Sequence, residues 1–198
     1  NVMQADTTFV TPGIAVNSFN RLNHRDEMYF SLFKPESTPL WQGNLKRYRI
    51  ADAVIYDKNG SEAIDSATGL FKPTARSWWS SSADGGAIEK GGAADRVVAN
   101  SASRKVYTYL GDMTPPTGVS LSGYPINENN DDITKELLGI ELASDDYRDD
   151  LVKWVRGLDA TGVADPLHSA PSVVIYGGTD ESPLSTIFYG DNQGYLHA

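Results

Sequence analysis

Short connections between strand-forming segments constrain this chain more than any other feature of its sequence. Four segments rich in β-branched and aromatic residues occupy its first third, at 8–16, 28–33, 45–50 and 53–56. Pro12-Gly13, Pro35 and the turn at 57–60 punctuate them. Because such connections are too short for parallel crossovers, the strands must pair with opposite directions. The sequence therefore predicts antiparallel sheets.

The C-terminal part of the chain returns to the same pattern. Strand-forming segments stand at 173–176 and 186–189, and a turn at 191–194 leads into a last short strand at 195–198. A strand is also expected at 104–110. The segment 72–95 is instead rich in Ser, Gly and Ala. We expect it to be a loop that Trp78 and Trp79 anchor, because a disordered linker rarely carries two tryptophans.

One helix is specified by its own residues. Ser144 suits the N-cap, and the two aspartates that follow it place negative charge where the helix dipole favours it. Gly157 suits the left-handed position after the last turn. Apolar residues at helical spacing form one face, which we expect to pack on the β part: Tyr147, Leu151, Trp154 and Val155. A shorter helix is expected at 133–138, so 127–164 is interpreted as a small helical insertion.

Charge and composition exclude several classes of function. The 198 residues include 17 Lys and Arg against 26 Asp and Glu, a formal net charge of −9, which disfavours nucleic acid as a partner. The basic cluster Lys46-Arg47-Tyr48-Arg49 alternates between the faces of a strand and is interpreted as a solvated strand. The chain has no cysteine, and no apolar run reaches the length of a membrane span.

The candidate catalytic residues do not form a recognisable set. The three histidines, His24, His168 and His197, lack the paired spacing of a zinc site. Asp165, His168 and Ser169 supply the residue types of a hydrolase triad without a G-x-S-x-G elbow. We therefore expect hydrogen-bonding roles for His168 and His197 and no enzymatic activity.

The sequence offers two candidate binding sites. Asp57, Asn59 and Asp65 offer oxygen donors to calcium. The match to an EF-hand loop fails, because Gly60 is at the fourth position instead of the sixth and Thr68, at the twelfth, cannot supply a bidentate carboxylate. A plain turn is favoured there, with weak calcium binding at most. Trp78 and Trp79 are candidates for an aromatic platform that binds a sugar, and anchoring of the loop is the alternative.

Several short blocks of this sequence occur in an order that resembles the order found in a known protein family. The longest are Trp41-Gln42-Gly43-Asn44-Leu45-Lys46-Arg47-Tyr48-Arg49-Ile50, Asp165-Pro166-Leu167-His168-Ser169-Ala170-Pro171 and Gly190-Asp191-Asn192-Gln193-Gly194-Tyr195-Leu196-His197-Ala198. The others lie at 17–25, 28–35, 57–60, 63–65, 68–71, 77–80, 84–85 and 91–94. Together they resemble the PilC/PilY family of type IV pilus assembly and tip-adhesin proteins.

The resemblance implies both a fold and a role. Residues 1–126 would be a β-rich region before a quinoprotein-like β-propeller, and 165–198 would be the opening strands of that propeller, which continues beyond them in family members. The protein would be a secreted, non-enzymatic pilus biogenesis factor and tip adhesin in the bacterial periplasm, outer membrane or cell surface. Its partners would be minor pilins, the rest of a longer chain, and host receptors or glycans. The family's calcium loop lies in the later propeller, outside this chain.

Two other functions remain open from the sequence. A carbohydrate-binding β module would use the tryptophans at 78 and 79. A fragment of a quinoprotein-like dehydrogenase propeller would share the hairpin at 190–198. That enzyme needs a cofactor pocket formed by repeated blades, and this sequence contains no such repeat.

Overall fold

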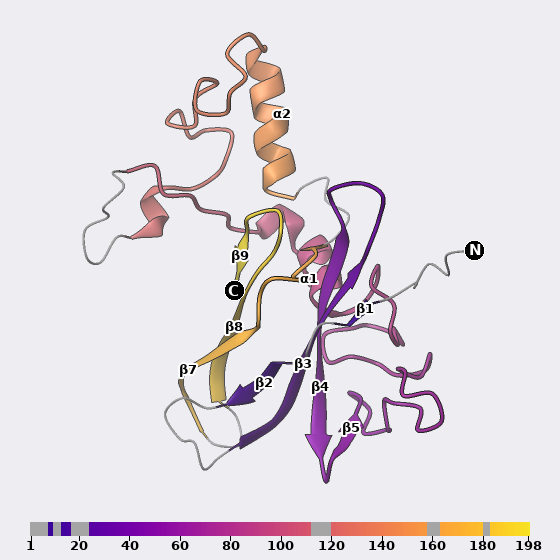
Figure 1. The fold of residues 1–198 in the computed structure, drawn as a ribbon. Helices are drawn as coiled ribbons and strands as arrows, with labels where there is room; N and C mark the ends of the chain where they lie inside the picture. The colour runs from indigo at the N-terminus through magenta and orange to yellow at the C-terminus, as the bar shows by residue number, and fades with distance from the viewer. Residues whose placement is uncertain (1–7, 10–12, 17–23, 112–119, 158–162, 180–182) are drawn as a thin grey trace. The chain divides into compact units, whose positions relative to one another are not determined.

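The computed structural model describes residues 8–9, 13–16, 24–111, 120–157, 163–179 and 183–198. In this part of the chain the fold is mainly antiparallel β-sheet, as the sequence predicts, with two short α-helices (Figure 1). The chain divides into two compact units, residues 1–96 with 162–198 (unit 1) and residues 97–161 (unit 2). The expected division at 126 and 164 stays a prediction. Residues 17–23, which begin the first family-like block, lie outside the described residues.

Unit 1 contains a six-stranded antiparallel sheet centred on two long strands. Its strands are β1 (Thr8–Phe9), β2 (Gly13–Val16), β3 (His24–Lys34), β4 (Gln42–Ala51), β5 (Val54–Tyr56) and β6 (Val163–Ala164). β1 and β2 both pair with β3, whereas β5 and β6 pair with opposite ends of β4. The edge of β4 between β5 and β6 is therefore open to other partners.

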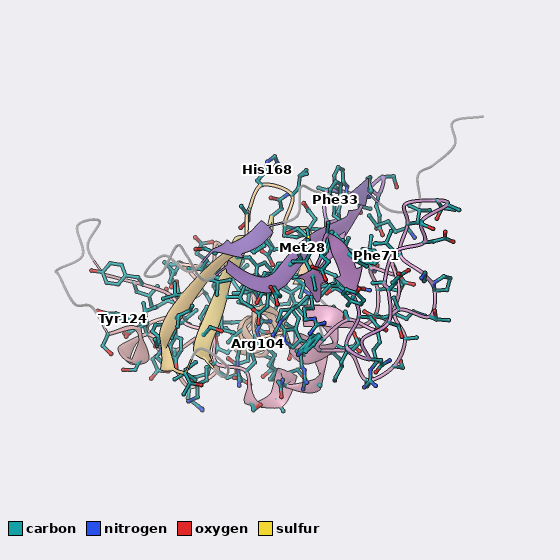
Figure 2. All side chains as sticks on the ribbon, turned by 90° about the horizontal axis from the view of Figure 1, so that it is seen from below. Met28, Phe33, Phe71, Arg104, Tyr124 and His168 are labelled. Carbon is teal, nitrogen blue, oxygen red and sulfur yellow. The ribbon has the colours of Figure 1, made fainter. Side chains whose placement is uncertain are left out.

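An apolar core lies between this sheet and the segment that follows β5. Its buried residues come from both: Met28, Phe30, Leu32, Tyr48, Ala63, Phe71, Ala75 and Ile88. Three rings form its centre, with Tyr48 stacked on Phe71 at 4.6 Å and Phe30 edge-on to both. Met28 and Phe71, two of the buried residues, are labelled in Figure 2. Aromatic pairs in these geometries stabilise a core beyond their buried area alone.

A second sheet ends unit 1. It comprises β7 (Ser172–Gly178), β8 (Pro183–Gly190) and β9 (Leu196–His197), paired in sequence order. The strands predicted at 173–176 and 186–189 are confirmed, and Gly194 takes a positive φ of 89° in the turn before β9. Such a φ suits glycine, which lacks the Cβ that would clash.

The helices agree with the sequence only in part. α2 (Asp145–Val155) begins as predicted, with the Ser144 hydroxyl accepting the N–H of Tyr147. α1 (Gly92–Ala99) begins inside the segment 72–95, which the sequence predicts to be a loop. Turns replace the short helix expected at 133–138, and Tyr107 forms only an isolated bridge where a strand was expected. The short 3-10 helices Ser101–Ser103 and Leu121–Gly123 complete the described elements. No helix among these residues has the length and apolarity needed to cross a bilayer.

The buried face of α2 differs from the predicted one. Tyr147 and Trp154 are 55% and 48% exposed, whereas Val152 is buried. The guanidinium of Arg148 donates to the carbonyls of Glu128, Asn130 and Ile133. Arg156, on the same face, pairs with the Glu128 carboxylate at 2.7 Å. The segment before α2 offers carbonyl and carboxylate oxygens as hydrogen-bond acceptors, and the two arginines are directed towards them. The arginines are therefore more buried than Trp154, which the apolar pattern predicts to be buried.

Truncation of Val152 tests this register. We expect Val152→Ala to lower the free energy of unfolding by about 2 kcal/mol, because it removes two buried methyl groups and leaves a cavity. Val98, which is 48% exposed on α1, is the matched control. Its change to Ala should alter stability by less than about 0.5 kcal/mol in the same urea titrations. Equal effects of the two changes would contradict the assignment.

Candidate functional site

The proposed calcium ligands hold the backbone of a turn. Asp57 is buried, and its Oδ1 accepts the N–H groups of Asn59 and Ser61 at 2.9 Å. Its Oδ2 accepts the N–H of Arg76 at 3.1 Å. Asp65 accepts the N–H of Ala67 in a turn of its own. Within the described residues no three His, Cys, Asp or Glu side chains gather as a metal site, and weak calcium binding stays a prediction.

The two tryptophans contact residues of the two central strands of the sheet, Trp78 at β4 and Trp79 at β3. The backbone N–H of Trp78 donates to the carbonyl of Arg47 at 3.0 Å. Arg47 lies in the part of β4 between the end that pairs with β5 and the end that pairs with β6. The Arg47 guanidinium lies 5.1 Å from the centroid of the Trp78 ring, and the Trp79 ring lies 6.2 Å from that of Tyr29. Both tryptophans are half-buried. These contacts favour an anchoring role, and sugar binding by the remaining ring surface stays a prediction.

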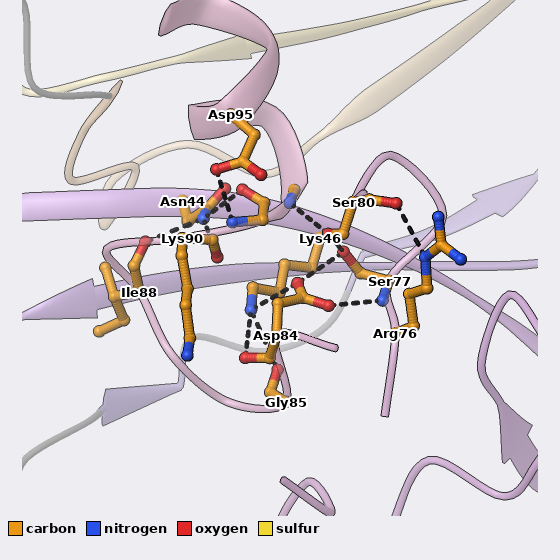
Figure 3. A network of polar contacts seen from close by, with 12 residues as sticks. Asn44, Lys46, Arg76, Ser77, Ser80, Asp84, Gly85, Ile88, Lys90 and Asp95 are labelled. Atoms are coloured by element: carbon orange, nitrogen blue, oxygen red, sulfur yellow. Dashed lines mark hydrogen bonds and ion pairs between the residues drawn. The ribbon is translucent and has the colours of Figure 1, made fainter. Parts of the chain in front are cut away.

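A buried ion pair that the sequence did not indicate joins β4 to the segment 77–92. The side chains of Lys46 and Asp84 are 0% and 2% exposed, and Lys46 Nζ lies 2.8 Å from Asp84 Oδ2 (Figure 3). Nζ also donates to the carbonyls of Asp84 and Gly85, at 3.2 and 3.0 Å. The interpretation of 46–49 as a solvated strand is therefore wrong for Lys46 and for Tyr48, which is also buried. The reason is that the loop after β5 covers this face of β4.

Two serines complete the environment of the Asp84 carboxylate. Oδ1 accepts the N–H of Ser77 at 2.7 Å, and Oδ2 accepts the Ser77 hydroxyl at 2.8 Å. The Ser77 and Ser80 hydroxyls are 2.6 Å apart, and Ser80 Oγ accepts the N–H of Gly92. Burial lowers the pKa of Lys46, an effect that the hydrogen bond and charge of Asp84 oppose.

The neighbours of Lys46 on β4 bind the same loop. The Asn44 amide donates to the carbonyls of Ile88 and Gly91, at 2.9 and 3.0 Å, and its oxygen accepts the N–H of Ala94. Tyr48 donates its hydroxyl proton to the Gly85 carbonyl at 3.2 Å, and burial raises the pKa of that hydroxyl far above its usual value. Alternate side chains of β4 thus fix the loop by its backbone.

Close approach in this loop requires glycine. Gly91 and Gly92 have φ values of +73° and +60°. A Cβ on Gly91 would lie 2.1 Å from Asp84 Oδ2, and one on Gly92 would lie 2.6 Å from Asn44 Oδ1. Both the backbone conformation and the lack of space therefore exclude side chains here.

A second polar junction joins distant segments around Asp165. Its N–H donates to the carbonyl of Trp41 at 3.1 Å, and its carbonyl accepts the N–H of Asn192 at 2.9 Å. Its carboxylate accepts the Asn192 side-chain amide at 2.6 Å. Gly43 permits this approach, because a Cβ there would lie 2.3 Å from the carbonyl oxygen of Ala164. Ser169 Oγ adds a bond by accepting the N–H of Gly190 at 2.7 Å.

The C-terminal turn is held by its own side chains. Asp191 Oδ1 accepts the N–H groups of Gln193 and Tyr195, both at 3.0 Å. Asp191 Oδ2 lies 2.8 Å from Nε2 of His197, whose ring stacks on Tyr189 at 4.6 Å. His168, by contrast, is exposed at the periphery in Figure 2. The residue types of a triad at 165–169 thus have separate partners: Asp165 binds Asn192, and Ser169 binds Gly190.

Comparison of the chain with protein-family models, with curated proteins and with solved structures gave no significant match.

Loss of the Lys46 charge should be costly. We expect Lys46→Met to lower the free energy of unfolding by about 3–5 kcal/mol, because it leaves the Asp84 carboxylate buried without its cation. Lys58, an exposed lysine, is the control, and its change to Met should cost less than about 0.5 kcal/mol. Urea titration measures both, and a loss below about 1 kcal/mol for Lys46→Met would place the pair in contact with water.

A side chain at Gly43 should break the Asp165 junction. We expect Gly43→Val to lower the free energy of unfolding by about 3 kcal/mol or more, since its Cβ would overlap backbone atoms of Ala164 and Asp165. Gly177 on β7 is the control, because a Cβ there meets nothing within 4 Å. Thermal melts of both variants check the expectation, which fails if Gly43→Val is no less stable than Gly177→Val.

Proposed function

We propose that this chain is a non-enzymatic, β-rich segment of a secreted type IV pilus biogenesis factor and tip adhesin of the PilC/PilY type. It contributes to pilus assembly and surface attachment, with minor pilins and the rest of a longer chain as partners. It acts in the periplasm, in the outer membrane, or exposed at the pilus tip or cell surface. The observation that carries the proposal is the Asp165 junction.

The junction gives the family-like blocks a common physical basis. Trp41 and Gly43 belong to one block, Asp165 and Ser169 to a second, and Asn192 to a third. Hydrogen bonds and close backbone contact join all three. Chance matches of short motifs have no reason to meet in space, whereas blocks that define one fold must do so. The contacts therefore support the resemblance as a property of the whole segment.

The blocks at 77–80, 84–85 and 91–94 support it in the same way. Asp84, from the block at 84–85, pairs with Lys46 of the block at 41–50 and accepts hydrogen bonds from Ser77. Gly91 and Gly92, from the block at 91–94, lie against Asn44, and the N–H of Gly92 also binds Ser80. In both networks the polar groups are directed to one another and to backbone. That use of Asp, Ser and Lys supports a scaffold role in preference to a catalytic one.

The second sheet supports the proposed start of a propeller. β7, β8 and β9 form a three-stranded antiparallel sheet, one strand short of a propeller blade. It leaves Tyr176, Leu184 and Leu196 largely exposed. Apolar residues on a small sheet of this kind are typical of surfaces that pack against further structure. In the proposal, later blades of the longer chain cover them.

Deletion of the gene in the source bacterium tests the function. The expected result is loss of surface pili by electron microscopy and loss of attachment to a solid surface. A wild-type copy should restore both, as should the Gly177→Val variant, whereas Gly43→Val should not, with secreted levels compared by immunoblot. Unchanged piliation and attachment in the deletion strain would refute the proposal.

A further inference from the structure

Lys46 Nζ lies directly beside the carboxyl group of Asp84. Nζ has three oxygen neighbours, the carbonyls of Asp84 and Gly85 and the Oδ2 of Asp84, at 3.2, 3.0 and 2.8 Å (Figure 3). An unprotonated amine has two N–H groups and one lone pair. When the two carbonyls accept the two N–H groups, the lone pair is left facing the Asp84 carboxyl group.

The Asp84 carboxyl group is correspondingly placed as an electrophile. Ser77 donates its backbone N–H to Oδ1 at 2.7 Å and its hydroxyl to Oδ2 at 2.8 Å. Donors fixed in this way polarise a carbonyl and stabilise the oxyanion that forms when an amine adds to it. Both reacting side chains are almost fully buried. Burial lowers the pKa of the Lys46 amine, which favours its neutral form, and it excludes the water that would hydrolyse the product.

We propose that Lys46 and Asp84 join in an intramolecular isopeptide bond after the chain folds. A proton passes from the ammonium to the carboxylate, which gives a neutral amine and a neutral carboxylic acid. Nζ then adds to Cγ of Asp84, the Cγ–O bond of the acid breaks, and its oxygen leaves as water with one proton from the amine. The reaction needs no oxidant or other reactant.

The bond would tie the centre of β4 to the loop that covers it, closing a loop between residues 38 apart in sequence. Cross-links of this kind stabilise a protein chiefly by restricting its unfolded chain. The chain has no cysteine and cannot use a disulfide for this purpose. The inference is independent of the proposed function, because it depends only on the contacts of Lys46 and Asp84.

Mass spectrometry of the full chain tests the proposal. The expected intact mass, measured after denaturation, is lower than the mass of the sequence by one water molecule. Proteolysis should yield a branched peptide that joins Lys46 to Asp84. Lys46→Arg and Asp84→Ala should each restore the full mass, whereas Lys58→Arg, at an exposed lysine, should keep the deficit.

A cyclic imide at Asp84-Gly85 also loses one water and must be distinguished. The N–H of Gly85 donates to the Ala75 carbonyl at 2.9 Å, so the nitrogen that would form the imide is engaged. A linear peptide that lacks water at Asp84, or a deficit that persists in Lys46→Arg, would identify the imide and overturn the proposal. So would an undiminished intact mass after prolonged incubation of the folded protein. If Lys46→Arg does not fold, the branched or linear form of the wild-type peptide decides.

Discussion

The burial of the Lys46 side chain is the constraint on which the arrangement of unit 1 depends. An amino group withdrawn from water costs several kcal/mol unless each of its protons meets an acceptor. Here the acceptors are the Asp84 carboxylate and the carbonyls of Asp84 and Gly85, all from one turn of the covering loop. Because these oxygens must converge on one atom, the segment 77–92 has a single path across β4. Displacement of that turn by one residue would leave a buried charge without partners.

The sheet therefore holds its covering loop by two different forces. β3 contributes Met28, Phe30 and Leu32 to an apolar core, to which β4 adds the Tyr48 ring. Asn44 and Lys46 of β4 instead bind the loop through their polar ends. Apolar burial is strong but tolerant of small shifts, whereas hydrogen bonds to fixed carbonyls are directional. This division explains how a segment poor in large apolar residues takes a definite course. Short contact distances and the local backbone conformation require the serines and glycines of this segment.

The sequence predicted the elements whose signals are local. Runs of β-branched and aromatic residues located β3, β4, β7 and β8, and Ser144 located the start of α2, because each signal depends on neighbours in the chain. It did not predict the interior faces. Alternation placed Lys46 and Tyr48 together but could not reveal that a distant loop covers them. Helical spacing selected Trp154, while the carbonyls beside α2 drew Arg148 inward. Both errors arise from polar partners remote in sequence, which hydrophobic periodicity does not register.

The same reasoning explains what a family-like signature can report. In the block at 190–198, Asp191 holds the turn and His197, and Asn192 binds Asp165. Substitution at these positions would disturb packing before it disturbed any external contact, so the block marks a fold. In the proposed role, recognition of pilins or receptors must then use side chains that do not take part in the polar networks around Lys46 and Asp165. Tyr176, Leu184 and Leu196 are of that kind, since they are exposed on a sheet whose register is fixed elsewhere. Such positions can vary with the partner while the frame beneath them stays constant.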